Sequence, residues 1–364
     1  RAKREGFISA YTKTKLINQK KLSSIMLCLG IESTAHTFGA GIVDSKGKVL
    51  ANVKDTYTTV SGGIHPSEAK LHHLRVKDNV IMQALDQANI KKKDISIISF
   101  SQGPGLPPCL VVGMETAKNV SAELKIPVIG VNHCIAHLEI GRLRTGARDP
   151  VLLYTSGANT QIIAYEGGKF RIFGETLDQG VGNFIDSFAR HIGLGFPGGP
   201  KIQELAERGK NYIEIPYVVK GMDVSFSGML TNLKQKYDSG KYEKEELAHS
   251  LQETAFAMLL EVSERAIFHC QKKELLLGGG VACNKRLQEM TRTMCKEAGL
   301  KFFVPENEFL VDNGAMIAWQ GMLEYGAKSS KREEGNAGSR ELRYLDEIDI
   351  RPNWRTDQVV VKYR

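Results

Sequence analysis

Hydrophobic and polar positions follow one another along the chain in blocks that predict an α/β protein. The run 25–31 is almost entirely apolar, polar residues follow it, and a second apolar run covers 39–43. Two short apolar runs joined by a polar turn predict a β-hairpin. Residues 69–88 carry apolar side chains at helical spacing, and a short buried-type strand over 95–100 leads into a glycine- and proline-containing loop at 103–108.

The same order of elements begins again near the middle of the chain. Residues 151–154 and 161–165 predict two strands joined by the small-residue turn 155–160. Because two hairpins each open an α/β segment, we expect a duplicated fold of two lobes with a cleft between them and a boundary near Asp149 and Pro150. With 364 residues, the chain is long enough for two cores of ordinary size.

The second half alternates helices and strands in the same way. Residues 244–271 predict a long helix and 274–277 a buried strand, after which Gly278–Gly280 opens a helix over 284–295. Toward the end, the polar stretch 327–339 predicts a surface loop and 358–362 a terminal strand. The expected organisation is a leader at 1–25, an N-terminal lobe at 26–150, a C-terminal lobe at 151–330 and a tail at 331–364.

Positive charge is concentrated in the leader. The chain has a formal net charge of +8, of which residues 1–25 carry +6 and the remainder +2. The leader has no long apolar segment, so it does not resemble a secretory signal. A transit-like segment and a basic arm stay open, and we favour sequence upstream of a natural start at Met26, where the first strand begins. The net charge is therefore weak evidence for nucleic-acid binding by the body of the protein.

Two exclusions follow from composition. No apolar run approaches the roughly 20 residues that cross a bilayer, so we expect no membrane span. The six cysteines are scattered without a C-x-x-C pair, which argues against a zinc ribbon or a disulfide scaffold. We expect a reducing, cytoplasmic location.

His133 and His137 are the first candidates for chemistry. Four residues apart, they would share one helix face at the spacing of a metal pair, although by itself this spacing favours two helix histidines satisfied by local hydrogen bonds. A zinc protease would have glutamate where this chain has Cys134. Asp312 is a natural third ligand, but it is also a good N-cap for the helix predicted over 315–325.

Two glycine-rich turns are candidates for anion binding. The turns 155–160 and 278–282 would allow backbone N–H groups to approach a phosphate closely. Neither has the P-loop or the Rossmann pattern. Phosphate contact and simple tight turns both remain possible interpretations.

Six ordered motifs together carry a family resemblance. They are His133-x-x-x-His137, Tyr154–Thr160, Gly193–Pro200, Lys220–Gly228, Gly278–Ala282 and Asp312–Met316. In this order they resemble the tRNA threonylcarbamoyladenosine transferase family, in the archaeal and eukaryotic branch that works inside the KEOPS complex. The resemblance covers about Met26 to Met322.

The resemblance implies an actin/sugar-kinase/Hsp70-type fold whose interlobe cleft holds a nucleotide and one metal. The implied metal ligands are His133, His137 and Asp312, with Tyr154 at or beside the site. The implied nucleotide contacts are Tyr154, Thr155, Ser156, Gly157, Ala158, Asp186, Gly199 and Asn284, with Gln203 standing where the family often has an acid. Glu32 is a candidate for substrate orientation or proton handling, or else it caps its turn. Ser33 replaces the family's usual glycine and would add a hydroxyl near the phosphate.

The implied reaction moves the threonylcarbamoyl group from threonylcarbamoyl-AMP to the exocyclic amine of the tRNA adenosine next to the anticodon. Fe²⁺ or Zn²⁺ suits the ligand set, and threonylcarbamoyl-AMP or ATP would be the nucleotide. Expected partners are tRNA, a kinase-like ATPase subunit and the small accessory subunits of KEOPS. The alternatives are an ATP-dependent small-molecule kinase or ATPase of the same fold, which would hold magnesium through carboxylates and phosphates, and a non-catalytic tRNA-binding scaffold.

Overall fold

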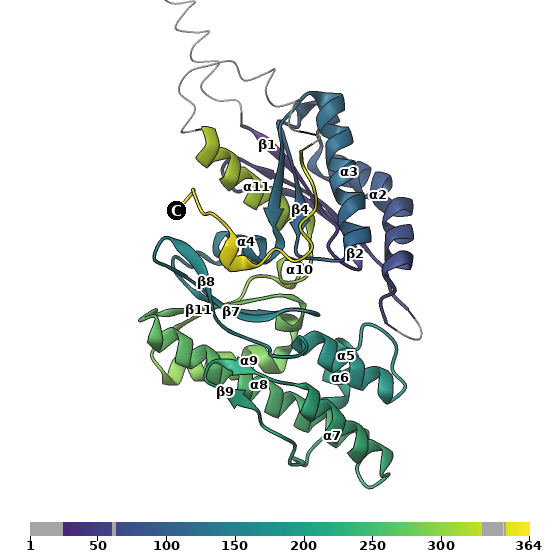
Figure 1. Ribbon diagram of the computed structural model, residues 1–364, viewed down its shortest axis with the longest axis vertical. Helices are drawn as coiled ribbons and strands as arrows, with labels where there is room; N and C mark the ends of the chain where they lie inside the picture. The colour runs from purple at the N-terminus through teal and green to yellow at the C-terminus, as the bar shows by residue number, and fades with distance from the viewer. Residues whose placement is uncertain (1–24, 60–62, 330–344, 346) are drawn as a thin grey trace, which may run out of the picture.

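Two five-stranded sheets organise the chain, one in each lobe (Figure 1). The computed structural model describes residues 25–59, 63–329, 345 and 347–364. The first sheet has the order β3-β2-β1-β4-β5. Its strands are β1 (Leu27–Glu32), β2 (Thr37–Asp44), β3 (Val49–Thr56), β4 (Ile97–Gly103) and β5 (Val128–Asn132). The predicted leader lies outside the described residues, except for Ile25.

The second sheet repeats the plan of the first. Its order is β12-β11-β6-β7-β8. Its strands are β6 (Val151–Thr155), β7 (Thr160–Glu166), β8 (Lys169–Glu175), β11 (Glu274–Gly278) and β12 (Lys301–Phe303). In both sheets an antiparallel three-strand meander comes first, and two parallel strands are then added beside its first strand. The predicted duplication is therefore confirmed, and the two predicted hairpins open the two sheets.

Helices cover both faces of the first sheet. Packed on one face are α2 (Pro66–Ala88) and α3 (Pro107–Leu124), and on the other are α4 (His133–Thr145) and α11 (Gly314–Ser329) (Figure 1). Helix α11 comes late in the chain, yet it lies directly on β1 and β2. A Cβ atom added at Gly41 would stand 2.1 Å from the backbone nitrogen of Ala315, so only glycine permits this approach.

The C-terminal lobe is mainly helical on its outer side. Its helices are α5 (Val181–His191), α6 (Gly199–Ala206), α7 (Ser227–Asp238), α8 (Lys244–His269), α9 (Lys285–Glu297) and the short α10 (Asn307–Leu310), and a small ribbon is formed by β9 (Val219–Lys220) and β10 (Asp223–Val224). Helix α8 supplies much of the core of this lobe, through buried side chains such as Leu251, Phe256 and Leu259. The predicted long helix and the glycine-opened helix are both present.

The C-terminal segment 347–364 touches both lobes (Figure 1, yellow). On the first lobe, the backbone N–H of Arg351 donates to the Gln102 carbonyl at 2.7 Å, and the Asn132 amide donates to the Trp354 carbonyl at 3.2 Å. On the second lobe, the Arg355 guanidinium donates to the Glu175 carboxylate at 3.1 Å. The tail therefore crosses the junction between the sheets.

Two predictions about the end of the chain are wrong. Residues 358–362 form no strand: a 3₁₀ turn covers Thr356–Gln358, and Val359 and Val361 pack into a cluster with Trp354. These two valine side chains pack against other side chains, and among the described residues the backbone of this segment forms no strand hydrogen bonds with a neighbouring strand. The predicted start of the loop at residue 327 is also too early, because α11 continues to Ser329. The rest of the predicted loop, residues 330–339, lies outside the described part of the chain.

Candidate functional site

The histidine pair stands at the first turn of α4, as predicted. Asn132 caps the helix, since its side-chain oxygen accepts from the backbone N–H groups of Cys134 and Ile135 at 3.0 and 3.2 Å. The helix therefore begins at His133, at the carboxyl end of β5. The two imidazole rings share one face, with centroids 4.8 Å apart.

Asp312 meets this pair from the start of α11. Its Oδ1 lies 3.3 Å from the Nε2 atom of each histidine, and the three ligand atoms all lie within 4.8 Å of one another. Asp312 is not consumed as a helix cap, because the neighbouring Asn313 performs that task by accepting from the Met316 N–H at 2.9 Å. The carboxylate is therefore free to act as the third ligand of a cation.

Glu32 stands behind His133. Its Oε2 is 2.9 Å from His133 Nδ1, while Oε1 accepts from the Thr34 backbone N–H at 2.7 Å. Glu32 thus caps its turn and also orients the imidazole. With Nδ1–H donating to Glu32, Nε2 keeps its lone pair and points toward Asp312, which is the usual arrangement of a metal-binding histidine and its supporting carboxylate.

The electrostatics of the group favour a cation. Burial would lower the pKa of His133, but the carboxylates of Glu32 and Asp312 outweigh it and raise that pKa. Burial likewise opposes ionisation of Asp312, yet His133 and His137 hold the pKa of Asp312 well below its usual range. The pKa of His137 is lowered, chiefly by burial. A negative Asp312 and a neutral His137 are the protonation states in which these side chains bind metals.

Tyr154 borders the group from the C-terminal lobe. Its ring centroid lies 5.2 Å from that of His137. The side chain is fully buried, and its hydroxyl has no hydrogen-bond partner among the described residues. Since a buried polar atom normally has a partner, this hydroxyl beside the ligand set fits a bound group. Burial raises the pKa of Tyr154.

The turn between β6 and β7 presents its backbone toward solvent. The Ser156 N–H and hydroxyl both bond to the Asn159 carbonyl, at 2.9 and 3.1 Å, which closes the turn. Gly157 and Ala158 are exposed, and neither backbone N–H donates to another described residue. These two donors suit an anion. Thr155 plays a different part, because its buried hydroxyl donates to the Gly278 carbonyl at 3.3 Å.

The remaining predicted nucleotide contacts lie on the helices beside this turn. Asp186 on α5 accepts from the Gly198 N–H at 2.7 Å, which fixes the start of α6 at Gly199. Gln203 accepts from the Lys285 N–H at 3.1 Å. The Asn284 oxygen caps α9, and its amide donates to Gln252. Asn284 is therefore committed to local structure, whereas Gly199 has open space where a Cβ would stand.

The departure from the family pattern at Ser33 has a structural outcome. The Ser33 hydroxyl points toward Gly113 of α3, where a Cβ would lie only 1.9 Å from it, so it faces the interior of the first lobe rather than the cleft. The caps Asn132 and Asn313 were missed by the sequence analysis. Each directly precedes the first turn of its helix, which is the pattern that could have identified it.

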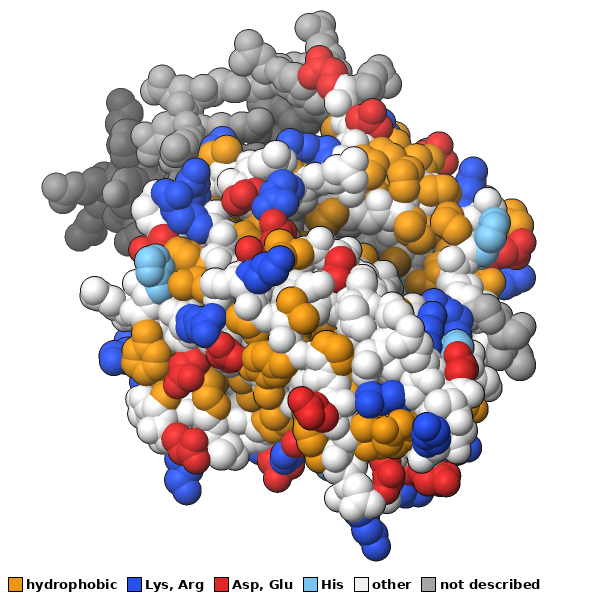
Figure 2. Space-filling model, turned by 60° about the horizontal axis from the view of Figure 1, so that its bottom comes forward, with side chains coloured by type: hydrophobic (Ala, Val, Ile, Leu, Met, Phe, Trp, Pro, Cys, Tyr) orange, Lys and Arg blue, Asp and Glu red, His pale blue; other side chains and the backbone are white. Residues whose placement is uncertain are grey.

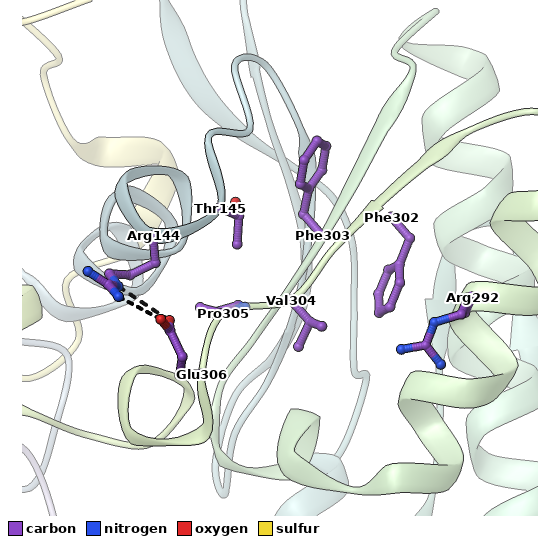
Figure 3. A pocket seen from close by; sticks show the side chains of 8 residues that line it. All are labelled: Arg144, Thr145, Arg292, Phe302, Phe303, Val304, Pro305 and Glu306. Atoms are coloured by element: carbon purple, nitrogen blue, oxygen red, sulfur yellow. Dashed lines mark hydrogen bonds and ion pairs between the residues drawn. The ribbon is translucent and has the colours of Figure 1, made fainter.

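A surface hollow of about 530 Å³ lies elsewhere, at the far end of α4 (Figure 3). Arg144 and Arg292 stand on opposite sides of it, with Phe302 and Phe303 of β12 between them. Arg144 is held by an ion pair with Glu306. Because the metal candidates stand at the opposite end of α4, this hollow is separate from the site.

Surface charge gives little support for a broad basic patch. On the face that Figure 2 shows, lysine and arginine side chains are interspersed with aspartate and glutamate. Arg142 pairs with Glu139, as Arg144 does with Glu306. In the part of the chain that the structure describes, no helix is both long and apolar enough to span a membrane.

Comparisons with known proteins point to one family. The profile of a family described as tRNA N6-adenosine threonylcarbamoyltransferase matches residues 48–319. A protein of that name from Thermococcus sibiricus is 52% identical over 339 residues, covering 93% of this chain and 100% of the relative. A probable bifunctional tRNA threonylcarbamoyladenosine biosynthesis protein from Methanothermobacter thermautotrophicus is 50% identical, over 89% of this chain and 60% of the relative.

Solved structures support the fold. HypF from T. kodakarensis aligns with a TM-score of 0.59 at 14% identity, covering 83% of this chain and 48% of that chain. Component A of (R)-2-hydroxyglutaryl-CoA dehydratase from Acidaminococcus fermentans aligns with a TM-score of 0.52 at 13% identity, covering 84% of this chain and 100% of that chain. Together with the repeated sheet order, these likenesses confirm the predicted actin/sugar-kinase/Hsp70-type fold.

Proposed function

The chain belongs to the tRNA N6-adenosine threonylcarbamoyltransferase family and is a transferase of tRNA threonylcarbamoyladenosine formation; we propose that its reaction depends on one divalent transition metal held by His133, His137 and Asp312. The observation that carries the proposal is the convergence of two imidazole nitrogens and one carboxylate oxygen within 4.8 Å. Two nitrogen ligands and one oxygen ligand suit iron or zinc and leave coordination positions open.

The proposed donor is threonylcarbamoyl-AMP, and the acceptor is the amine of the tRNA adenosine next to the anticodon. The amine nitrogen attacks the carbamoyl carbon, the bond from that carbon to the phosphate oxygen breaks, AMP leaves, and the amine loses one proton. When bound, the metal supplies Lewis acidity toward the oxygens on which negative charge develops. We assign no general base.

The residues of the chain divide the remaining work. The free N–H groups of Gly157 and Ala158 bind the phosphate, and Asp186, beside Gly199, accepts from the ribose hydroxyls. Glu32 holds His133 in the orientation that presents Nε2 to the ligand group. Tyr154 lies between the metal ligands and the phosphate-binding turn, where its free hydroxyl can contact either the metal or the substrate. In this assignment Glu32 is a positioning residue.

The ligand set distinguishes this assignment from a kinase or ATPase of the same fold. Such an enzyme holds magnesium through carboxylates and phosphates and has no use for a histidine pair supported by a carboxylate. A tRNA-binding scaffold would need neither the metal ligands nor the exposed N–H groups of the turn between β6 and β7. We propose that tRNA is the substrate and that a kinase-like ATPase and small accessory subunits of a KEOPS-type complex are partners.

The test is reconstitution. The metal-loaded chain, with and without those subunits, is mixed with threonylcarbamoyl-AMP and a tRNA transcript, and the modified nucleoside is measured by mass spectrometry. We expect modification that is lost on chelation and restored by iron or zinc. Modification that is unchanged after complete metal removal would show that the metal assignment is wrong, while failure with every subunit present would reject the transfer itself.

A further inference from the structure

Lys54 of β3 stands at the edge of this site and has no part in the proposed metal and nucleotide contacts. It pairs with Gly39 in the β2–β3 ladder, two residues after the pair formed by Asn52 and Gly41. Residues directly opposite one another in antiparallel strands project from the same face of the sheet. Lys54 therefore shares a face with Asn52, whose side-chain oxygen accepts from the Ala315 N–H of α11 at 3.3 Å.

That face leads to the metal ligands. A Cβ atom added at Gly39 would stand 3.0 Å from the Gly314 nitrogen and 3.4 Å from Glu32 Cβ. The lysine opposite Gly39 is thus next to the segment that carries Asp312. In agreement, partial burial lowers the pKa of this otherwise exposed Lys54 side chain, while the carboxylates of Asp312 and Glu308 act in the opposite direction.

The ammonium group is available for a ligand. Lys54 is exposed, and no hydrogen bond or ion pair joins its side chain to another described residue. Two arginines at the far end of α4 differ in this respect, since Arg142 pairs with Glu139 and Arg144 with Glu306. A lysine that is surrounded by acids without pairing with any of them is placed to receive an anion.

We propose that Lys54 binds the carboxylate of the threonyl group in the donor substrate. This inference rests on the proposed function. Threonylcarbamoyl-AMP has two anionic groups, the phosphate and the carboxylate. The phosphate-binding turn and Asp186 belong to the C-terminal lobe, so a donor held there extends its acyl end toward the N-terminal lobe, where Lys54 stands beside Asp312. In this position Lys54 offsets the negative charges of Asp312 and Glu308, which would otherwise repel the carboxylate.

The test compares two non-transferable acyl-sulfamate analogues of the donor, one built from threonine and one from threoninol, which lacks the carboxylate. Calorimetry with the metal-loaded full chain measures the affinity of each, and of AMP, for wild type, Lys54→Met, Lys54→Arg and the control Lys48→Met. Lys48 is an exposed lysine just before the opposite end of β3, so its substitution matches the change in charge.

We expect wild type and Lys48→Met to prefer the threonine analogue by about 10- to 100-fold, the effect of one hydrogen bond to a charged group. Lys54→Met should lose this preference, Lys54→Arg should keep most of it, and the affinity for AMP and the metal content should stay unchanged. An equal preference in Lys54→Met and wild type would overturn the inference alone. Weakened AMP binding in Lys54→Met would assign the lysine to the phosphate instead and also overturn it. A wild-type chain that binds neither analogue would contradict the proposed function itself.

Discussion

The first turns of the two sheets occupy equivalent positions, but one buries its polar side chains whereas the other exposes its backbone. At the end of β1, Glu32 and the following Ser33 are fully buried, and the Glu32 side chain bonds to the turn and to His133. After β6, Gly157 and Ala158 are exposed and offer backbone N–H groups. In the proposed function the first turn supports the metal ligands through a side chain, whereas the second presents main-chain donors to an anion.

The difference follows from what packs behind each turn. The first is covered by α3, where Ser33 faces Gly113, and by the start of α4, where His133 meets Glu32. The second is braced from below by the start of α5, where the N–H groups of Gly182 and Asn183 donate to the carbonyls of Ser156 and Gly157 at 3.1 and 2.9 Å. Because its carbonyls are occupied from α5, the second turn keeps its own N–H groups outward. The two copies of the duplicated fold thus differ in which groups they present, a side-chain carboxylate in one and backbone N–H groups in the other.

Removal of a metal ligand should have the largest effect. His137→Ala deletes one of two imidazoles and should reduce bound metal from about one ion per chain to near zero, with transfer activity lost in parallel. Elemental analysis of the purified variant measures this. His191→Ala is the control, because His191 lies on α5 and pairs with Asp238. Stoichiometric metal in His137→Ala would refute the ligand assignment.

Removing the charge of Glu32, which supports His133, should have a smaller effect on metal binding. Glu32→Gln removes the charge behind His133 while keeping the side-chain size, and we expect metal affinity to fall by about 10- to 100-fold. Competition with a chelator of known affinity gives the value, and Glu68→Gln on the exposed start of α2 is the control. An unchanged metal affinity would mean that Glu32 only caps its turn.

The histidine pair could be predicted from the sequence, whereas the contact between Glu32 and His133 could not. The histidine pair is local, because residues at i and i+4 share a helix face whatever the rest of the chain does. The Glu32–His133 contact joins residues 101 positions apart, and only the pairing of β1, β4 and β5 brings them together. The choice between Asp312 and Asn313 as helix cap was equally invisible, since both side chains cap well and only packing decides. In the tail, a run of valines predicts a strand, but a strand forms only beside another strand with a free edge. The sequence does not show whether such an edge lies next to the tail.

The second turn is tested through nucleotide binding. AMP at 100 times its dissociation constant should stabilise the wild-type chain by about 2.7 kcal/mol. Gly199→Ala should leave the melting temperature without AMP unchanged, because a Cβ there meets nothing within 4 Å, and it should weaken AMP binding by roughly 10-fold if the nucleotide fills that space. Differential scanning fluorimetry measures both quantities. Equal AMP-induced shifts in the two proteins would move the nucleotide away from α6.

The smallest effect is expected for tRNA affinity. The chain without residues 1–25 carries only +2, and binding dominated by phosphate contacts requires several basic residues. It should bind tRNA weakly at physiological salt, and Arg144→Ala should change this little, since Arg144 is paired with Glu306. A fluorescence anisotropy titration decides the point. Submicromolar, salt-resistant binding would reveal a recognition surface that the charge count does not show.

The close packing of α11 on the first sheet has a consequence for turnover. His133 and His137 lie on α4, Asp312 lies two residues before the start of α11, and both helices pack on the sheet of the N-terminal lobe, α11 through the glycine contact at Gly41. All three ligands thus travel with one lobe, whereas Tyr154 and the phosphate turn belong to the other. We therefore expect the cleft to open and discharge AMP while the ion stays in place, so that a single loading with metal serves many catalytic cycles.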